Sequence, residues 1–248
     1  MYHYKNILII SDNFFLINGF CSLAKKYEGL HVDYNCSAVN TSLRNNTSLP
    51  VKLTAITLKQ DWPQVIAKYD LVISLHCKQL FPAEMVKAVK CINVHPGYNP
   101  YNRGWFPQVF SILNGLPFGA TIHEIDEQLD HGAIIAQKKV TGELWETSID
   151  VYNKIVQAEI ELLDEFLPAI LNNTYQTITP EVEGNVNLKK DFNALCQLDL
   201  NEELTMGKAI DRLRALTHGE YKNAWFSHPE TGEKIYVSLN LEKGKNKN

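Results

Sequence analysis

Short apolar runs that end in polar residues recur along the first half of the chain. Asn6–Ser11, Asp70–Leu75 and Lys90–Val94 each have the length and apolar content of a strand. Between them, Phe14–Tyr27 carries apolar residues at helical spacing, and Trp62–Lys68 is consistent with a short helix. Strands that alternate with helices at this pace predict an α/β fold with an open, mostly parallel sheet and helices on both faces.

The same pattern predicts the other elements. We expect strands at His31–Ser37, Val51–Thr57, Ala120–Asp126 and Ala133–Val140, a loop at Asn40–Ser48, and helices at Pro82–Lys87, Pro107–Asn114 and Ile149–Leu171. A linker, Asn172–Asn187, then leads to a small module: an acidic and apolar stretch (Asp191–Leu204), a helix (Met206–His218), a β-hairpin through His228–Gly232 and a polar tail (Lys243–Asn248) expected to be disordered. The predicted domains are 1–178 and 179–248.

Composition limits the classes of function. Lys plus Arg number 24 and Asp plus Glu 28, and the resulting net charge of −4 disfavours nucleic acid or an acidic membrane as the main partner. No apolar run approaches the roughly 20 residues that span a bilayer. The first six residues lead into a strand without a signal-peptide layout, so we expect a cytoplasmic protein. The five scattered cysteines favour reduced thiols over disulfides or a zinc site.

The loops that follow the strands are the expected ligand site. In such Rossmann-like sheets, ligands bind outside the carboxyl ends of the strands. This places Ser11–Asn13, His76–Leu80 and His95–Gly104 together on one rim of the sheet.

One strand end carries an amide and an imidazole. Asn93 and His95 are two residues apart, so both side chains can point into one cleft. An amide N–H can donate to a carbonyl oxygen that gains negative charge, as in acyl transfer. An imidazole can bond the same oxygen or handle a proton of an attacking amine. Because a protonated His95 cannot act as a base, activity should fall on the acid side.

A second segment supplies a carboxylate. It contains the run Gly119–His123, then Asp126, and then Asp130 in a tight turn beside Gly132. A carboxylate in such a turn can reach an imidazole, orient it and raise its pKa. Each feature alone has an ordinary alternative, because Asn93 fits a strand-end cap, His95 a hydrogen-bonded rim histidine and Asp130 a plain turn residue.

Together these motifs resemble those of the 10-formyltetrahydrofolate-dependent formyltransferases. The resemblance rests on Asn93-Val94-His95, Arg103-Gly104, the Gly-x-Thr-x-His motif of Gly119–His123, and Leu129-Asp130-His131-Gly132. It implies that Asn93 and His95 stabilise the tetrahedral oxyanion, and that Asp130 orients His95 and assists proton movement. It also implies that 10-formyltetrahydrofolate is the co-substrate and contacts Gln79, Leu80, His123, Asp126 and Asp130.

The appendages separate the branches of this family. The initiator-tRNA branch has a larger C-terminal domain and needs positive charge, and the formyltetrahydrofolate hydrolase branch has a regulatory domain before its core. The glycinamide ribonucleotide branch has a Gly-rich turn after its first strand, where this chain has Ser11–Phe15. The loop His95–Trp105 and, in the tail, Asp191-Phe192 and Asp211–Thr217 are most similar to those of the sugar-nucleotide N-formyltransferases. This resemblance implies a dTDP-linked amino-dideoxy sugar as acceptor, commonly dTDP-4-amino-4,6-dideoxyglucose, for O-antigen or surface polysaccharide synthesis.

Such an acceptor needs a cation for its diphosphate and aromatic faces for its thymine. The candidate residues are Lys78 for the diphosphate, Asn13 for the sugar, and Tyr101, Trp105, Tyr152, Phe192, Tyr221 and Trp225 for stacking or hydroxyl contacts. A solvated surface lysine and core aromatics are the alternatives. No His or Cys cluster has metal-ligand spacing, so we expect no metal. A homodimer is the expected assembly.

Two other functions stay open. One is formylation of glycinamide ribonucleotide, and the other is a non-catalytic folate or nucleotide-binding module, because fold alone does not secure activity.

Overall fold

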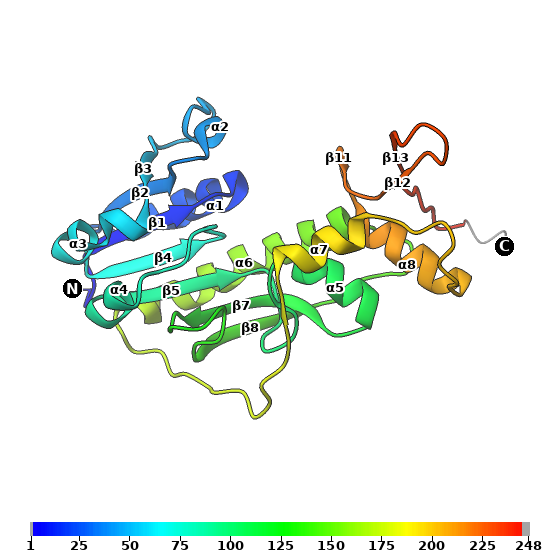
Figure 1. Cartoon of the computed structure of the whole chain (residues 1–248). Helices are drawn as coiled ribbons and strands as arrows, with labels where there is room; N and C mark the ends of the chain where they lie inside the picture. The colour runs from blue at the N-terminus through cyan, green and yellow to red at the C-terminus, as the bar shows by residue number, and fades with distance from the viewer. Residues whose placement is uncertain (1, 245–248) are drawn as a thin grey trace.

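A computed structural model describes residues 2–244 of the chain. A seven-stranded sheet forms its centre (Figure 1). The strands lie in the order β3-β2-β1-β4-β5-β7-β8; the pairs β5–β7 and β7–β8 are antiparallel and the other pairs are parallel, so β7 alone of these seven runs in the opposite direction. The strands are β1 (Asn6–Ser11), β2 (His31–Ser37), β3 (Thr54–Ile56), β4 (Leu71–Leu75), β5 (Lys90–His95), β7 (Phe118–Glu124) and β8 (Ile134–Val140). The predicted fold class is confirmed.

Alternate residues of each central strand pack on opposite faces of the sheet. Ile7 and Ile9 of β1 pack with α1 (Phe14–Ala24) and α6 (Ser148–Leu171). Leu8 and Ile10 pack on the other face with α3 (Leu58–Lys68) and α4 (Ala83–Ala88). These four side chains are fully buried, as expected for strands covered by helices on both sides.

Several element boundaries differ from the prediction. The predicted loop at residues 40–48 contains a short helix, α2 (Thr41–Arg44), because the Asn40 side chain accepts a hydrogen bond from the N–H of Leu43. The predicted strand at 51–57 shortens to β3, and α3 starts earlier than predicted, at Leu58. The helix predicted through His218 ends at Leu216, after which β10 (Thr217–His218) pairs with β11 (Tyr221–Lys222).

The C-terminal module packs on α5 (Pro107–Asn114) rather than on a core of its own. Val109, Phe110 and Ile112 of α5 share one hydrophobic cluster with residues from α7 (Lys189–Cys196) and α8 (Met206–Leu216). The predicted hairpin is present as β12 (Trp225–Ser227) and β13 (Lys234–Tyr236). Of the tail predicted to be disordered, residues 245–248 lie outside the described residues, and Lys243 lies over the Trp145 ring.

The segment at 172–187, predicted to be a linker, pairs with residues near the carboxyl end of β5 and with β8. Its last residues form β9 (Val186–Asn187), which pairs with β6 (Arg103–Gly104), and Ile178 bridges to Ile134. Figure 1 shows this segment running below the sheet before it reaches α7. It therefore forms part of the wall around the strand ends.

The strand order creates a topological switch point between β1 and β4. The chain moves outward from β1 to β2 and β3, and then returns to place β4 on the other side of β1. Crossover helices consequently leave the carboxyl ends of β1 and β4 open as a crevice. Asn13 and His76, which follow these two strands, lie at that position. Across residues 2–244, no helix has the length and apolar character needed to span a bilayer.

Candidate active site

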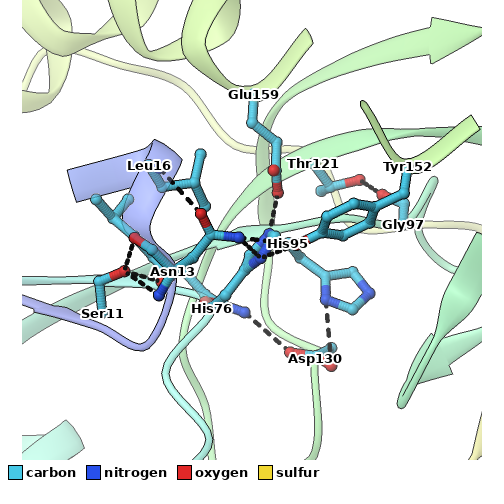
Figure 2. A network of polar contacts seen from close by, with 12 residues as sticks. Ser11, Asn13, Leu16, His76, His95, Gly97, Thr121, Asp130, Tyr152 and Glu159 are labelled. Atoms are coloured by element: carbon cyan, nitrogen blue, oxygen red, sulfur yellow. Dashed lines mark hydrogen bonds and ion pairs between the residues drawn. The ribbon is translucent and has the colours of Figure 1, made fainter. Parts of the chain in front are cut away.

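Three side chains predicted to converge do so at the ends of β5 and β7. Asn93 and His95 extend from β5, and Asp130 comes from the turn between β7 and β8. Asp130 Oδ1 accepts a hydrogen bond from Asn93 Nδ2 at 2.9 Å, and Asp130 Oδ2 lies 3.4 Å from His95 Nδ1. One carboxylate therefore contacts both the amide and the imidazole, and Figure 2 shows Asp130 facing His95.

The backbone of the turn fixes the position of Asp130. Its φ of 48° lies in the left-handed region, which a short polar residue tolerates. Asn99 Nδ2 donates to the Asp130 carbonyl at 2.8 Å, and the Gly104 N–H donates to the carboxylate at 3.1 Å. The pKa of Asp130 lies below its usual range: burial opposes ionisation, but the neighbouring His95 and the hydrogen bonds to the carboxylate outweigh it.

Burial of the His95 side chain has a larger effect on its pKa than the Asp130 carboxylate. Only 4% of its side chain is exposed. Burial lowers the pKa of His95 from 6.5 to about 4, although the Asp130 carboxylate acts in the opposite direction. The carboxylate acts on this pKa in the predicted direction, but the net shift is downward because the loss of water, which the prediction left out, is the larger effect.

The neutral imidazole has one free ring nitrogen. With Nδ1 directed at the Asp130 carboxylate, the Nδ1–H form is favoured, and Nε2 carries the lone pair. His95 Nε2 is buried and has no hydrogen-bond partner among the described residues. The arrangement is that of a base held by a carboxylate.

Both hydrogens of the Asn93 amide have acceptors in the protein. One goes to Asp130 and the other to His123 Nε2 at 3.2 Å, because His123 Nδ1 donates to the Glu124 carbonyl at 2.6 Å. Donation by Asn93 to an oxyanion requires one of these contacts to open, and the longer contact to His123 is the weaker. His123, predicted to contact the co-substrate, is 1% exposed and orients Asn93.

A cavity of about 320 Å³ adjoins Asp130, within the usual size range of ligand sites. Its lining combines the loop after β5 with the segment at 172–187, and it includes Asn99, Arg103, His131, Pro180 and Glu183. Arg103 is buried and donates to Glu183 at 2.6 Å. Asp126, a predicted folate contact, bonds His131 Nδ1 at 2.6 Å.

Gln79 and Leu80, the other predicted folate contacts, do not line this cavity. The Gln79 side chain accepts from the Leu58 N–H at 2.9 Å and donates to the Ile56 carbonyl at 3.1 Å. It thereby holds β3 and α3 to the loop after β4. Leu80 is 78% exposed at the rim. A folate contact by either residue stays a prediction.

The residues predicted to contact the acceptor differ in their location and exposure. Asn13 and Tyr152 lie together, with Asn13 Nδ2 donating to Tyr152 Oη at 2.8 Å. Lys78 and Tyr221 are exposed, and Tyr101 and Trp105 are partly buried, with Lys189 5.3 Å from the centre of the Trp105 ring.

Phe192 and Trp225 are members of the hydrophobic cluster of the C-terminal module. Phe192 is 8% exposed and its ring packs 4.0 Å from that of Phe106. Both residues follow the core alternative given above, because each occupies the apolar side of its helix or strand. Phe192 therefore has a packing role in this module, and a contact with the acceptor stays a prediction.

His76 is a site residue that the sequence pattern did not reveal. Its Nε2 lies 2.7 Å from Oε1 of Glu159, a fully buried carboxylate of α6. Its Nδ1 faces Tyr152 Oη at 3.2 Å and Asn13 Nδ2 at 3.3 Å. Figure 2 shows these four side chains as one network beside His95. One sequence feature did point to this network: Tyr152 and Glu159 are seven residues apart, which places them on one face of a predicted helix.

Within residues 2–244, no group of three or more His, Cys, Asp or Glu side chains has the arrangement of a metal site.

Comparison with known proteins agrees with this geometry. Residues 57–167 match the formyl transferase family, and residues 191–243 match the N-formyltransferase dimerization C-terminal domain. A dTDP-4-amino-4,6-dideoxyglucose formyltransferase from Mycobacterium bovis is 54% identical over 179 residues, covering 72% of this chain and 76% of that protein.

Two crystal structures extend the likeness over nearly the whole chain. A 4-N formyltransferase from Francisella tularensis is 46% identical, with a TM-score of 0.92, covering 96% of this chain and 98% of that one. A sugar N-formyltransferase from Shewanella is 42% identical, with a TM-score of 0.92, covering 97% and 99%. These sequence and structure matches show that the chain belongs to the formyl transferase family, among the sugar N-formyltransferases.

Proposed function

We propose that this protein transfers the formyl group of 10-formyltetrahydrofolate to the 4-amino group of dTDP-4-amino-4,6-dideoxyglucose. The observation that carries the proposal is the convergence of Asn93, His95 and Asp130 on one point at the strand ends. The identity of 54% to an enzyme named for this acceptor supports the choice of sugar.

The side chains divide the work of formyl transfer. The amine attacks the formyl carbon, and the carbonyl oxygen gains negative charge that the Asn93 amide can stabilise by donation. His95 Nε2 then accepts a proton from the attacking nitrogen and returns it to N10 of the folate as the C–N10 bond breaks. Asp130, 3.4 Å from Nδ1, stabilises the transient imidazolium.

Burial of His95 suits this shuttle. A solvent-exposed base would exchange the proton with water, whereas a side chain that is 4% exposed returns it to the leaving group. The low pKa of His95 keeps Nε2 unprotonated when the substrates bind. The protein contributes alignment and charge stabilisation, and the donor supplies the reactive carbonyl.

The test is an acceptor screen with the whole chain. The protein is incubated with 10-formyltetrahydrofolate and, in parallel, dTDP-4-amino-4,6-dideoxyglucose, the 3-amino isomer, or glycinamide ribonucleotide, and products are followed by mass. We expect the gain of one formyl group on the 4-amino sugar. Formylation of glycinamide ribonucleotide alone would replace the proposal, and folate binding without turnover on any amine would favour a binding module.

Several broader assignments form part of the proposal. We propose a catalytic domain at 1–178 and a C-terminal module at 179–248 that forms a homodimer, supported by the match of 191–243 to a family of dimerization domains. Light scattering tests the dimer. The proposed compartment is the cytoplasm and the proposed destination is a surface polysaccharide. Loss of N-formyl signals from that polysaccharide in a deletion strain would support the latter.

A further inference from the structure

The formyl transfer proposed above must dispose of two protons, and the shuttle through His95 accounts for one. An amino sugar arrives in water mainly as an ammonium ion, which has no lone pair for attack. It must lose one proton before the C–N bond forms and a second after it. The second returns to the folate leaving group. The first has to reach solvent, and the buried His95 is poorly placed to release it.

A second imidazole lies beside the first. Strands β4 and β5 are parallel, and their last paired residues are Leu75 and Val94. His76 and His95 follow immediately on neighbouring strands, which lie roughly 5 Å apart in a sheet. Figure 2 shows both side chains in the same cluster. His76 also borders the switch-point crevice between β1 and β4.

The contacts of His76 leave one ring nitrogen for a ligand. Nε2 is committed to Glu159 at 2.7 Å, so Nε2–H donates and Nδ1 carries the lone pair. The two contacts to Nδ1, from Asn13 Nδ2 at 3.3 Å and Tyr152 Oη at 3.2 Å, lie at the long end of the hydrogen-bond range. An ammonium group would make a shorter, charge-assisted bond to the same atom.

Glu159 is unusual for a structural partner. Its carboxylate is fully buried, and Oε2 has no hydrogen-bond partner among the described residues. A buried carboxylate with an unused oxygen is costly, and a neutral amide would hold the His76 ring as well. The full charge becomes useful when the imidazole acquires a positive charge.

We propose that His76, supported by Glu159, takes the first proton from the sugar ammonium and passes it to solvent. The N–H bond of the ammonium breaks, its proton moves to Nδ1, and the electron pair stays on the amine nitrogen for attack on the formyl carbon. The side chain of His76 is 12% exposed, which gives the imidazolium access to water. His76 and His95 thus handle one proton each, and the net reaction releases one proton.

The other groups around His76 fit this role. Glu159 and Tyr152 of α6 and His95 of β5 are its titratable neighbours, and the Asn13 amide completes the set. Tyr152 packs on His218 of β10. Burial raises the pKa of Tyr152, so its hydroxyl stays protonated beside the His76 ring. The Asp12 carboxylate nearby is occupied by Ser37, Asn40 and the N–H of Lys78.

The test uses pH to separate proton transfer from positioning. His76 has a φ of 58°, and Asn tolerates this region, so H76N keeps the backbone. We expect kcat/KM of H76N to be about 100-fold below wild type near neutral pH. The deficit should shrink as the pH is raised and the free amine becomes abundant in solution. A matched control is H31N, at an exposed histidine on β2, which should match wild type at every pH.

Two further variants keep the idea falsifiable if H76N folds poorly. E159Q retains an oxygen that accepts from Nε2 but removes the charge, and it should show a smaller deficit with the same dependence on pH. H76G tolerates the positive φ, and added imidazole should restore its rate in proportion to the neutral imidazole present.

A deficit that stays constant with pH, together with no rescue by imidazole, would reduce His76 to a positioning residue and overturn the inference. Wild-type turnover in the acceptor screen is measured separately. Absence of product there counts against the proposed function, whereas a normal wild type with a pH-independent H76N deficit counts only against the role of His76.

Discussion

The Asp130 carboxylate lies 3.4 Å from Nδ1 of His95, at a place where the imidazole is almost completely enclosed. The two effects on the ring oppose one another, because the negative charge favours the imidazolium and the loss of water disfavours it. Burial is the larger effect and lowers the pKa of His95 to about 4. The resting pair is therefore a neutral imidazole beside an ionised carboxylate.

We expect His95 to stay neutral throughout the physiological range. Nitrogen chemical shifts of the imidazole ring should show the Nδ1–H form from about pH 8 to about pH 5. A His95 midpoint at or above 6.5 would mean that the carboxylate outweighs burial. It follows that protonation of His95 limits activity only near pH 4.

The same shift makes stability depend on pH. Between about pH 6.5 and pH 4, the unfolded chain binds a proton at His95 that the folded chain does not. The free energy of unfolding should therefore fall as pH drops through this interval, by up to about 3 kcal/mol from this residue. Urea unfolding of wild type and H95Q at several pH values tests this. The H95Q curve should be flatter, and parallel curves would contradict the assignment.

Removal of either member of the pair should abolish most turnover. H95A loses the shuttle, and D130A loses the group that orients it, so we expect kcat to fall by about 10²–10⁴-fold in each. Binding of the sugar nucleotide, measured by calorimetry, should change little, because neither side chain belongs to the predicted nucleotide contacts. Wild-type rates in both variants would show that these residues are not the catalytic group.

The His95 ring fills the space beside Gly97, which leaves no room for a side chain at position 97. A Cβ at Gly97 would lie 2.5 Å from His95 Nε2 and 2.8 Å from Cδ2. The buried ring has little room to move, so G97A should lower kcat by about 10–100-fold through displacement of Nε2. The matched control is G207A in α8, where a Cβ meets nothing within 4 Å. It should keep the wild-type rate and gain up to about 1 kcal/mol of stability. Equal rates for both variants would contradict this account.

Asn13 should combine a structural role with an active-site role. Its Oδ1 caps α1 by accepting from the Leu16 N–H at 3.1 Å, while its Nδ2 contacts Tyr152 and His76. Thr205 caps α8 in the same way, accepting from Lys208 at 3.3 Å. N13A and T205A should each cost about 1 kcal/mol in thermal unfolding. Only N13A should also lower kcat/KM, by about tenfold or more. A T205A variant with the same loss of activity would show that the effect is one of stability.

The sequence predicted the catalytic side of the site better than the acceptor side. Asn93, His95 and Asp130 lie on two motifs with fixed spacing, and strand periodicity alone places Asn93 and His95 on one face. The acceptor side depends on pairs such as His76 and Glu159, which are 83 residues apart. Nothing local in the sequence marks such a pair. Phe192 lies in a hydrophobic cluster, and local sequence does not distinguish an aromatic residue of the core from one that contacts a ligand.

The sequence by itself determined the α/β architecture, the direction of the central strands and the order of Asn93, His95 and Asp130, the three proposed catalytic residues. These features follow from local apolar patterns and short motifs, which act over a few residues. Only the tertiary structure decided the charge of His95 and the partnership of His76 with Glu159. Both depend on how much water is excluded and on which distant helix packs over the strand ends, and burial is a property of the whole assembly of elements.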